Sequence, residues 1–187
     1  MTALGSLKQE HALIGRALTA LGRYATLLEA SPSADHRDLQ RFSGFFSDFT
    51  DLWHHGKEED LLLPALVKNG FAWDEGPVAR VREDHEQTTY LCRVIQQAAA
   101  QEGAWTDEDR RHAIVAIRSF IDFERLHMER EETVLYQAAI NRLPGETIEE
   151  IGRRCLDFEH QQFGAGAYDR LRADAEALFR KYEEGPR

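Results

Sequence analysis

The sequence has few cysteines and few prolines, and these shortages exclude several classes of protein. Only two cysteines, Cys92 and Cys155, occur in 187 residues, and no CxxC pair is present, so a thiolate zinc site is not expected. Both fall at helical positions, and we expect them to be small buried residues. Five prolines and 13 glycines argue against disorder and against a fibrous repeat.

The sequence also has fewer positive than negative charges, and it has no long apolar run. The formal net charge is −10, so the chain lacks the positive field that nucleic acid or anionic lipid requires, and we expect neither as a partner. The longest apolar run, LLLPALV, is too short to span a membrane. The N-terminus has no apolar stretch long enough for a signal peptide, so we expect a cytoplasmic protein.

What the sequence contains instead is helical periodicity along almost its whole length. Apolar residues spaced by three and four positions alternate with breaks at SPSAD, NGFAWDEGP, QEGAWTDED and LPGE. The second helix is expected over about 38–68 with a local kink at Pro64, and its stripe includes Leu52. The fourth is expected over about 107–141, opened by Thr106 and with Val134 on its stripe. Shorter helices should follow, the fifth opened by a capping box of Thr147 and Glu150 and the last over about 168–183.

No strand-like alternation of useful length appears, so the expected fold class is all-α. Four long helices with short connections favour an antiparallel up-down four-helix bundle with additional C-terminal helices. One domain over residues 1–187 is expected, with the bundle at about 4–140 and the C-terminal helices at about 147–184. The C-terminal helices would either pack across the bundle or mediate self-association, which leaves a homodimer open.

Each of the four long helices carries one histidine on its own apolar stripe. These histidines are His11, His55, His85 and His127. Glu59 follows His55 by four residues, and Glu131 follows His127 by the same spacing. Because positions i and i+4 share one face of an α-helix, each pair can address a single centre.

A metal centre explains this pattern better than a set of structural histidines does. A lone histidine on an apolar face is usually a hydrogen-bonded core residue, but four imidazoles and two carboxylates buried together would be costly without compensation. A bound cation would compensate for the burial of all six groups at once, because each group could serve as a ligand. Six protein ligands are too many for one tetrahedral zinc, and carboxylates able to bridge suit a dinuclear centre.

The segments KQEHALI, HHGKEEDLLLPAL, REDHEQT and HMEREETVLY resemble the hemerythrin-like, or HHE cation-binding, family over roughly residues 4–140. The resemblance implies a single hemerythrin-like domain with a non-haem di-iron centre. Its two iron ions would be bridged by carboxylates and by an oxo or hydroxo group, with Glu59 and Glu131 as the bridging pair. The metal ligands that the resemblance implies are His11, His55, Glu59, His85, His127 and Glu131.

The sequence departs from the oxygen-carrying hemerythrins at Thr89, where those proteins have a further histidine. Candidates for another ligand are Glu58, Glu124 and His160. Glu124 lies on the stripe, but a hydrogen bond or an arginine ion pair explains it at least as well, and His160 is expected to be peripheral. His54 points about 100° away from His55 on an ideal helix, so we expect it behind the ligands or at the surface.

The expected function is that of a di-iron protein that binds or responds to O2, NO or peroxide. Two alternatives stay open: a di-iron enzyme acting on peroxide or O2, and a structural helical module that binds zinc or no metal. No separate substrate pocket or catalytic base is legible in the sequence, so no catalytic residue is assigned.

Overall fold

The computed structural model describes residues 2–31, 36–101, 103 and 105–183, and every regular element in these ranges is helical. The all-α fold class is therefore confirmed for the described residues. None of these helices has the length and hydropathy that a membrane span requires. The elements are α1 (Ala3–Ala30), α2 (His36–Phe45), η1 (Phe46–His55), η2 (Glu58–Leu62), α3 (Leu63–Lys68), α4 (Gly76–Ala99), α5 (Asp107–Arg130), η3 (Glu131–Leu135), α6 (Tyr136–Arg142), α7 (Gly145–Phe163) and α8 (Ala167–Glu183).

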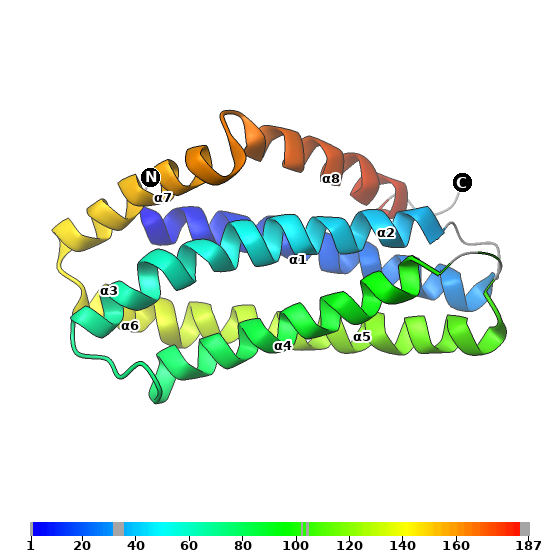
Figure 1. Ribbon diagram of the computed structural model, residues 1–187, viewed down its shortest axis with the longest axis horizontal. Helices are drawn as coiled ribbons and strands as arrows, with labels where there is room; N and C mark the ends of the chain where they lie inside the picture. The colour runs from blue at the N-terminus through cyan, green and yellow to red at the C-terminus, as the bar shows by residue number, and fades with distance from the viewer. Residues whose placement is uncertain (1, 32–35, 102, 104, 184–187) are drawn as a thin grey trace.

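The long helical segments lie side by side along one axis, with α7 and α8 running along one side of them (Figure 1). The α5 helix packs against both α1 and α4, and α4 also packs against α2 and η1. The C-terminal helices contact α1, and in addition α7 contacts η2 while α8 contacts α2. They therefore pack across the other helices, which is the first of the two arrangements expected from the sequence.

Two apolar clusters fill the interior, one toward each end of the long axis. On α1, Leu7 belongs to one cluster and Leu13 to the other, and His11 lies between them. The same order recurs on α4, where His85 separates Val81 from Cys92. The same order recurs along η1–η2 and along α5–η3, so the buried histidines of these segments share one layer between two apolar layers.

Three π-helical segments, η1, η2 and η3, flank this polar layer. In them the backbone N–H groups of Gly56, Leu63 and Tyr136 donate to the carbonyl five residues earlier. A π-helical turn holds more residues than an α-helical turn, so it changes which side chains face the interior. Leu52 and Val134, expected on the apolar stripes, are 54% and 49% exposed. Those two expectations were wrong because they assumed a uniform α-helical period.

The predicted helix boundaries hold in part. The segment expected over 38–68 is helical throughout, but it consists of α2, η1, η2 and α3, and its irregular turns precede Pro64, which lies in the first turn of α3. The capping box of Thr106 and Asp109 at the start of α5 is confirmed. The box expected at Thr147 is wrong, because α7 already begins at Gly145 and Pro144 precedes it without a side-chain cap. Cys92 and Cys155 are both buried and free, as predicted.

Gly56 offers a test of the contact between α7 and the segment that joins η1 to η2. A Cβ atom at this position would lie 2.9 Å from Cζ of Phe158 on α7. We expect Gly56→Ala to lower the free energy of unfolding by about 1–2 kcal/mol, because the overlap outweighs the helix propensity of alanine.

The matched control is Gly15→Ala in α1, where a Cβ would meet no atom within 4 Å. This variant should gain about 0.5–1 kcal/mol, since alanine is the better residue in a helix interior. Urea unfolding of both variants measures the difference. Equal stabilisation by the two substitutions would contradict the packing of Phe158 over Gly56.

Candidate metal centre

Five histidines and three glutamates occupy the polar layer between the apolar clusters. No member of the group is more than 4% exposed, and its members come from α1, η1, η2, α4, α5 and η3. Buried ionisable groups are costly unless they are paired, hydrogen-bonded or bound to a metal. The group consists of His11, His54, His55, Glu58, His85, Glu124, His127 and Glu131.

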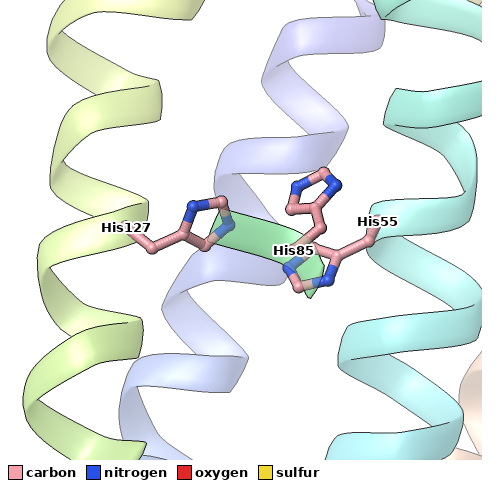
Figure 2. A group of neighbouring side chains, drawn as sticks. All are labelled: His55, His85 and His127. Atoms are coloured by element: carbon pink, nitrogen blue, oxygen red, sulfur yellow. The ribbon is translucent and has the colours of Figure 1, made fainter. Parts of the chain in front are cut away.

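Three of the histidines converge from three helical segments (Figure 2). The rings of His55 and His85 stack with their centroids 3.9 Å apart, and the ring of His127 meets both edge-on at 5.1 and 5.0 Å. One nitrogen from each ring lies within 4.8 Å of the other two. This geometry offers one nitrogen from each of three imidazole rings to a single cation.

A second group of donors forms around α1 and η1. The Nε2 atoms of His11 and His54 lie 2.9 Å apart, and Nε2 of His11 lies 3.1 Å from Oε2 of Glu131. Ligand atoms of these three residues also fall within 4.8 Å of one another. The centre therefore has two sets of histidine nitrogens.

Glu131 lies between the two sets and faces both. Its Oε2 atom is the one beside His11, whereas its Oε1 atom lies 3.3 Å from Nε2 of His85 and 3.3 Å from Nε2 of His127. The two oxygens of a single carboxylate thus point to different sets of nitrogens. This is the arrangement that a carboxylate bridging two cations requires.

Glu58 occupies a similar position from η2. Its Oε2 atom lies 3.3 Å from Nε2 of His85 and 3.8 Å from Nε2 of His54, so it also reaches both sets. The hydroxyl of Tyr136, which is fully buried, donates a hydrogen bond of 2.7 Å to Oε1 of Glu58. Tyr136 thereby holds one oxygen of Glu58 and leaves the other facing the histidines.

An outer ring of carboxylates lies on the Nδ1 side of the five histidines. An acidic side chain that hydrogen-bonds the outward nitrogen of a ligand histidine fixes the ring and makes the inward nitrogen more basic. Three of these contacts are within hydrogen-bond distance and two are longer, and in each the Nε2 atom is the one left for the centre. The pairs, with their nitrogen–oxygen distances, are His54–Glu10 at 2.8 Å, His85–Glu59 at 2.8 Å, His11–Glu132 at 2.9 Å, His127–Asp84 at 3.7 Å and His55–Asp51 at 3.9 Å.

Several polar atoms of the centre have no hydrogen-bond partner within the described chain. They are both ring nitrogens of His55, both ring nitrogens of His127, Oε2 of Glu58 and Oε1 of Glu124. The other oxygen of Glu124 accepts a 2.9 Å hydrogen bond from Thr88, and its orphaned oxygen lies 3.9 Å from Nε2 of His55. Unsatisfied imidazole nitrogens and carboxylate oxygens converging in one dry layer are the donors that a transition-metal cation would bind, so the residues present fit such an ion.

The buried imidazoles and carboxylates of the centre shift one another's pKa. Burial, together with the neighbouring His85 and His127, lowers the pKa of His55 well below its ordinary value, so its ring is neutral with a lone pair available. Burial disfavours the charged form of Glu131, but His127 and hydrogen bonds from His11 and His85 outweigh it and hold its pKa well below the usual range. For His11, burial is likewise outweighed by Glu131 and Glu58, which raise its pKa to about 9.

Five of the six ligands predicted from the sequence lie in this centre, and Glu59 lies at its edge. The Glu59 side chain is 47% exposed, and its Oε1 atom lies 2.8 Å from Nδ1 of His85 on the outer side of the ring. The neighbouring Glu58 points inward instead. The ligand assignment of each residue stays a prediction, but the structure places Glu58 between the nitrogen sets where Glu59 was expected.

His54 was expected behind the ligands or at the surface, yet it lies inside the centre beside His55. The reason is the π-helical conformation of η1, which brings adjacent histidines to the same interior layer. The sequence did contain a signal, because His54 and Glu58 have the same i, i+4 spacing as His55 and Glu59. His160 is exposed, which confirms the expectation that it is peripheral.

Comparison with known proteins gives one family and a few distant relatives. The sequence profile described as the hemerythrin HHE cation-binding domain matches residues 2–139. The chain is 22% identical over 168 residues to the "Uncharacterized protein Rv1995" of Mycobacterium tuberculosis and to the "Uncharacterized protein Mb2018" of Mycobacterium bovis. These matches cover 90% of this chain but only 65% of the length of each relative. No solved structure matches the chain significantly.

The two adjacent glutamates should differ in their effect on cation binding. Glu58→Ala removes a buried carboxylate that faces both nitrogen sets, so we expect fewer bound cations per chain than in the wild type. Glu59→Ala removes only the outer partner of His85, so it should weaken affinity by about 10–100-fold but keep full occupancy at excess metal.

Equilibrium dialysis against excess Co²⁺ measures the number of bound ions per chain, with circular dichroism to verify folding. A Glu59→Ala variant that loses as many ions as Glu58→Ala, or a Glu58→Ala variant that loses none, would contradict the inward placement of Glu58.

Proposed function

The chain belongs to the hemerythrin HHE cation-binding domain family, and on this premise we propose that it is a non-haem di-iron protein whose centre binds or responds to O2, NO or peroxide. The observation that carries the proposal is the position of Glu131, one oxygen beside His11 and the other beside His85 and His127. Two sets of nitrogens with a carboxylate facing both support two ions rather than one.

The histidines and glutamates of the centre can be assigned to two ions. His11 and His54 would hold one, and the second would be held by the group of His55, His85 and His127. Glu58 and Glu131 would serve both ions, with Glu124 available beside His55. Imidazole and carboxylate donors without thiolate suit iron. An antiparallel up-down arrangement of the four long segments is part of the same proposal.

A reduced pair of iron ions supplies electrons and an open coordination position for a small ligand. The chain supplies the surroundings. Aromatic side chains such as Phe46 and Phe120, whose ring centroids lie 4.7 Å apart, belong to the cluster on one side of the centre and keep water from it. Tyr136 holds Glu58 by its hydroxyl and lies 3.3 Å from Nε2 of His11, so it is placed to fix the position of a proton at either residue.

The alternative of a zinc-binding structural module is less consistent with the number of donors. A structural zinc site has four ligands, and the buried layer offers twice as many histidine and glutamate side chains. The other imidazoles and carboxylates of the layer would stay buried without a metal ion. The cytoplasmic location, the small ligand and the homodimer stay predictions from the sequence, as does enzymatic turnover of peroxide or O2.

Iron stoichiometry tests the proposal directly. Metal-free protein reconstituted with Fe²⁺ under anaerobic conditions should retain about two ions per chain, as a carboxylate-bridged pair requires. After exposure to air, near-ultraviolet absorption from a bridged ferric pair should develop. Glu131→Ala should retain about one ion or none, whereas Glu149→Ala on the exposed face of α7 should behave as the wild type. A wild-type protein that saturates at one ion would contradict the proposal.

Metal removal should also destabilise the protein, because it leaves the buried donors unpaired. A ligand present at 100–1,000 times its dissociation constant stabilises the folded state by about 2.7–4.1 kcal/mol. For a chain of this size the melting temperature should therefore fall by about 5–15 °C when a chelator removes the metal. Calorimetry of the loaded and chelated forms measures the difference. An unchanged melting temperature would show that the buried group does not hold the metal.

A further inference from the structure

A cavity of about 430 Å³ lies beside the centre, between the η1–η2 segment and α7. Its walls include the rings of Phe158 and Phe163 on the α7 side and the backbone of Gly56 opposite them. Asp60 and Gln162, which also line it, are exposed, so the cavity communicates with solvent. Its lining residues therefore connect the surface to the region of the buried histidines.

The polar lining of this cavity is acidic. Asp51, Glu59 and Asp60 contribute three carboxylates, and no lysine or arginine is among the lining residues. Such a lining raises the local concentration of cations and repels anions.

Asp51 is held in position by the residue that distinguishes this chain from the oxygen-carrying hemerythrins. The hydroxyl of Thr89 donates a 2.7 Å hydrogen bond to Oδ1 of Asp51. The same oxygen lies 3.9 Å from Nδ1 of His55. Thr89 thus orients a cavity carboxylate toward a buried histidine.

His55 links the cavity to the centre. Its side chain is 2% exposed, it lines the cavity, and neither ring nitrogen has a hydrogen-bond partner in the described chain. Its Nδ1 faces Asp51 of the cavity, and its Nε2 lies 3.9 Å from Glu124 of the centre. Three further cavities in the described part of the chain are lined by none of the buried histidines or glutamates of the centre.

We propose that this cavity is the entry site for the divalent cation, where Asp51, Glu59 and Asp60 collect the hydrated ion and pass it to His55. This inference rests on the proposed function, since it presupposes that the centre holds metal. It assigns to Glu59 a place at the entrance as well as beside His85. It also gives a role to Asp60, and it gives Asp51 a second role besides its place on the Nδ1 side of His55.

The rate of metal uptake tests the entry site separately from the capacity of the centre. Metal-free full-length protein is mixed with Co²⁺ in a stopped-flow spectrometer, and the final cobalt content is measured on the same samples. The variants are Asp60→Asn, which removes an exposed cavity charge, and Asp60→Lys, which reverses that charge. The control variant Asp122→Asn/Glu149→Gln removes two charges from exposed positions that do not line the cavity.

We expect Asp60→Lys to take up Co²⁺ about three- to tenfold more slowly than the wild type at low ionic strength, and Asp60→Asn to show a smaller effect in the same direction. Both should reach the wild-type cobalt content. The difference should shrink at high salt, because screening weakens attraction by exposed charges. The control variant should keep the wild-type rate.

Wild-type uptake rates in both cavity variants, or equal slowing in the control, would overturn the entry site while leaving the metal centre intact. Lower final cobalt content with an unchanged uptake rate would also overturn the entry site. The cavity carboxylates would then help to hold the bound ion rather than to collect it from solution. Failure of the wild type itself to bind cobalt would instead overturn the proposed function, and the entry site with it.

Discussion

The structure depends on how five imidazoles and three carboxylates are accommodated in a layer that water does not reach. An apolar cluster on each side excludes solvent, so these groups have only one another and their outer partners. Hydrogen bonds among them satisfy some atoms, yet both nitrogens of His55 and of His127 remain without partners. A cation pair in this layer would convert that unfavourable burial into stabilisation, because the same atoms would become ligands.

The outer carboxylates extend this constraint to the rest of the fold. Glu10 lies against Nδ1 of His54, accepts a 3.3 Å hydrogen bond from Trp53, and is also bonded by the buried amine of Lys57. Lys57 donates in turn to Glu159 on α7, at 2.7 Å. Through this chain a C-terminal helix beyond the residues matched by the family profile is connected to a histidine of the centre. The C-terminal helices are therefore part of the structure that orients the donors.

Periodicity in the sequence was sufficient for the fold class, the helix order and four of the five buried histidines. The predictions of which side chains face inward were wrong where the backbone departs from α-helical geometry. An ideal helix places Glu59 inward and His54 outward, whereas the π-helical turns of η1 and η2 bring His54 and Glu58 into the polar layer. The same cause exposes Val134 and buries Leu135 within η3. Such turns follow from tertiary packing, and no residue type in these segments predicts them.

The central claim is that two carboxylates lie between two separate cation positions. The most direct measurement is a crystal structure of the iron-loaded protein with anomalous diffraction at the iron edge. The account predicts two resolved iron peaks, one beside His11 and His54 and the other beside His85 and His127, with Glu58 and Glu131 contacting both. A single peak held by one histidine set, or two peaks with Glu59 in the place of Glu58, would contradict it.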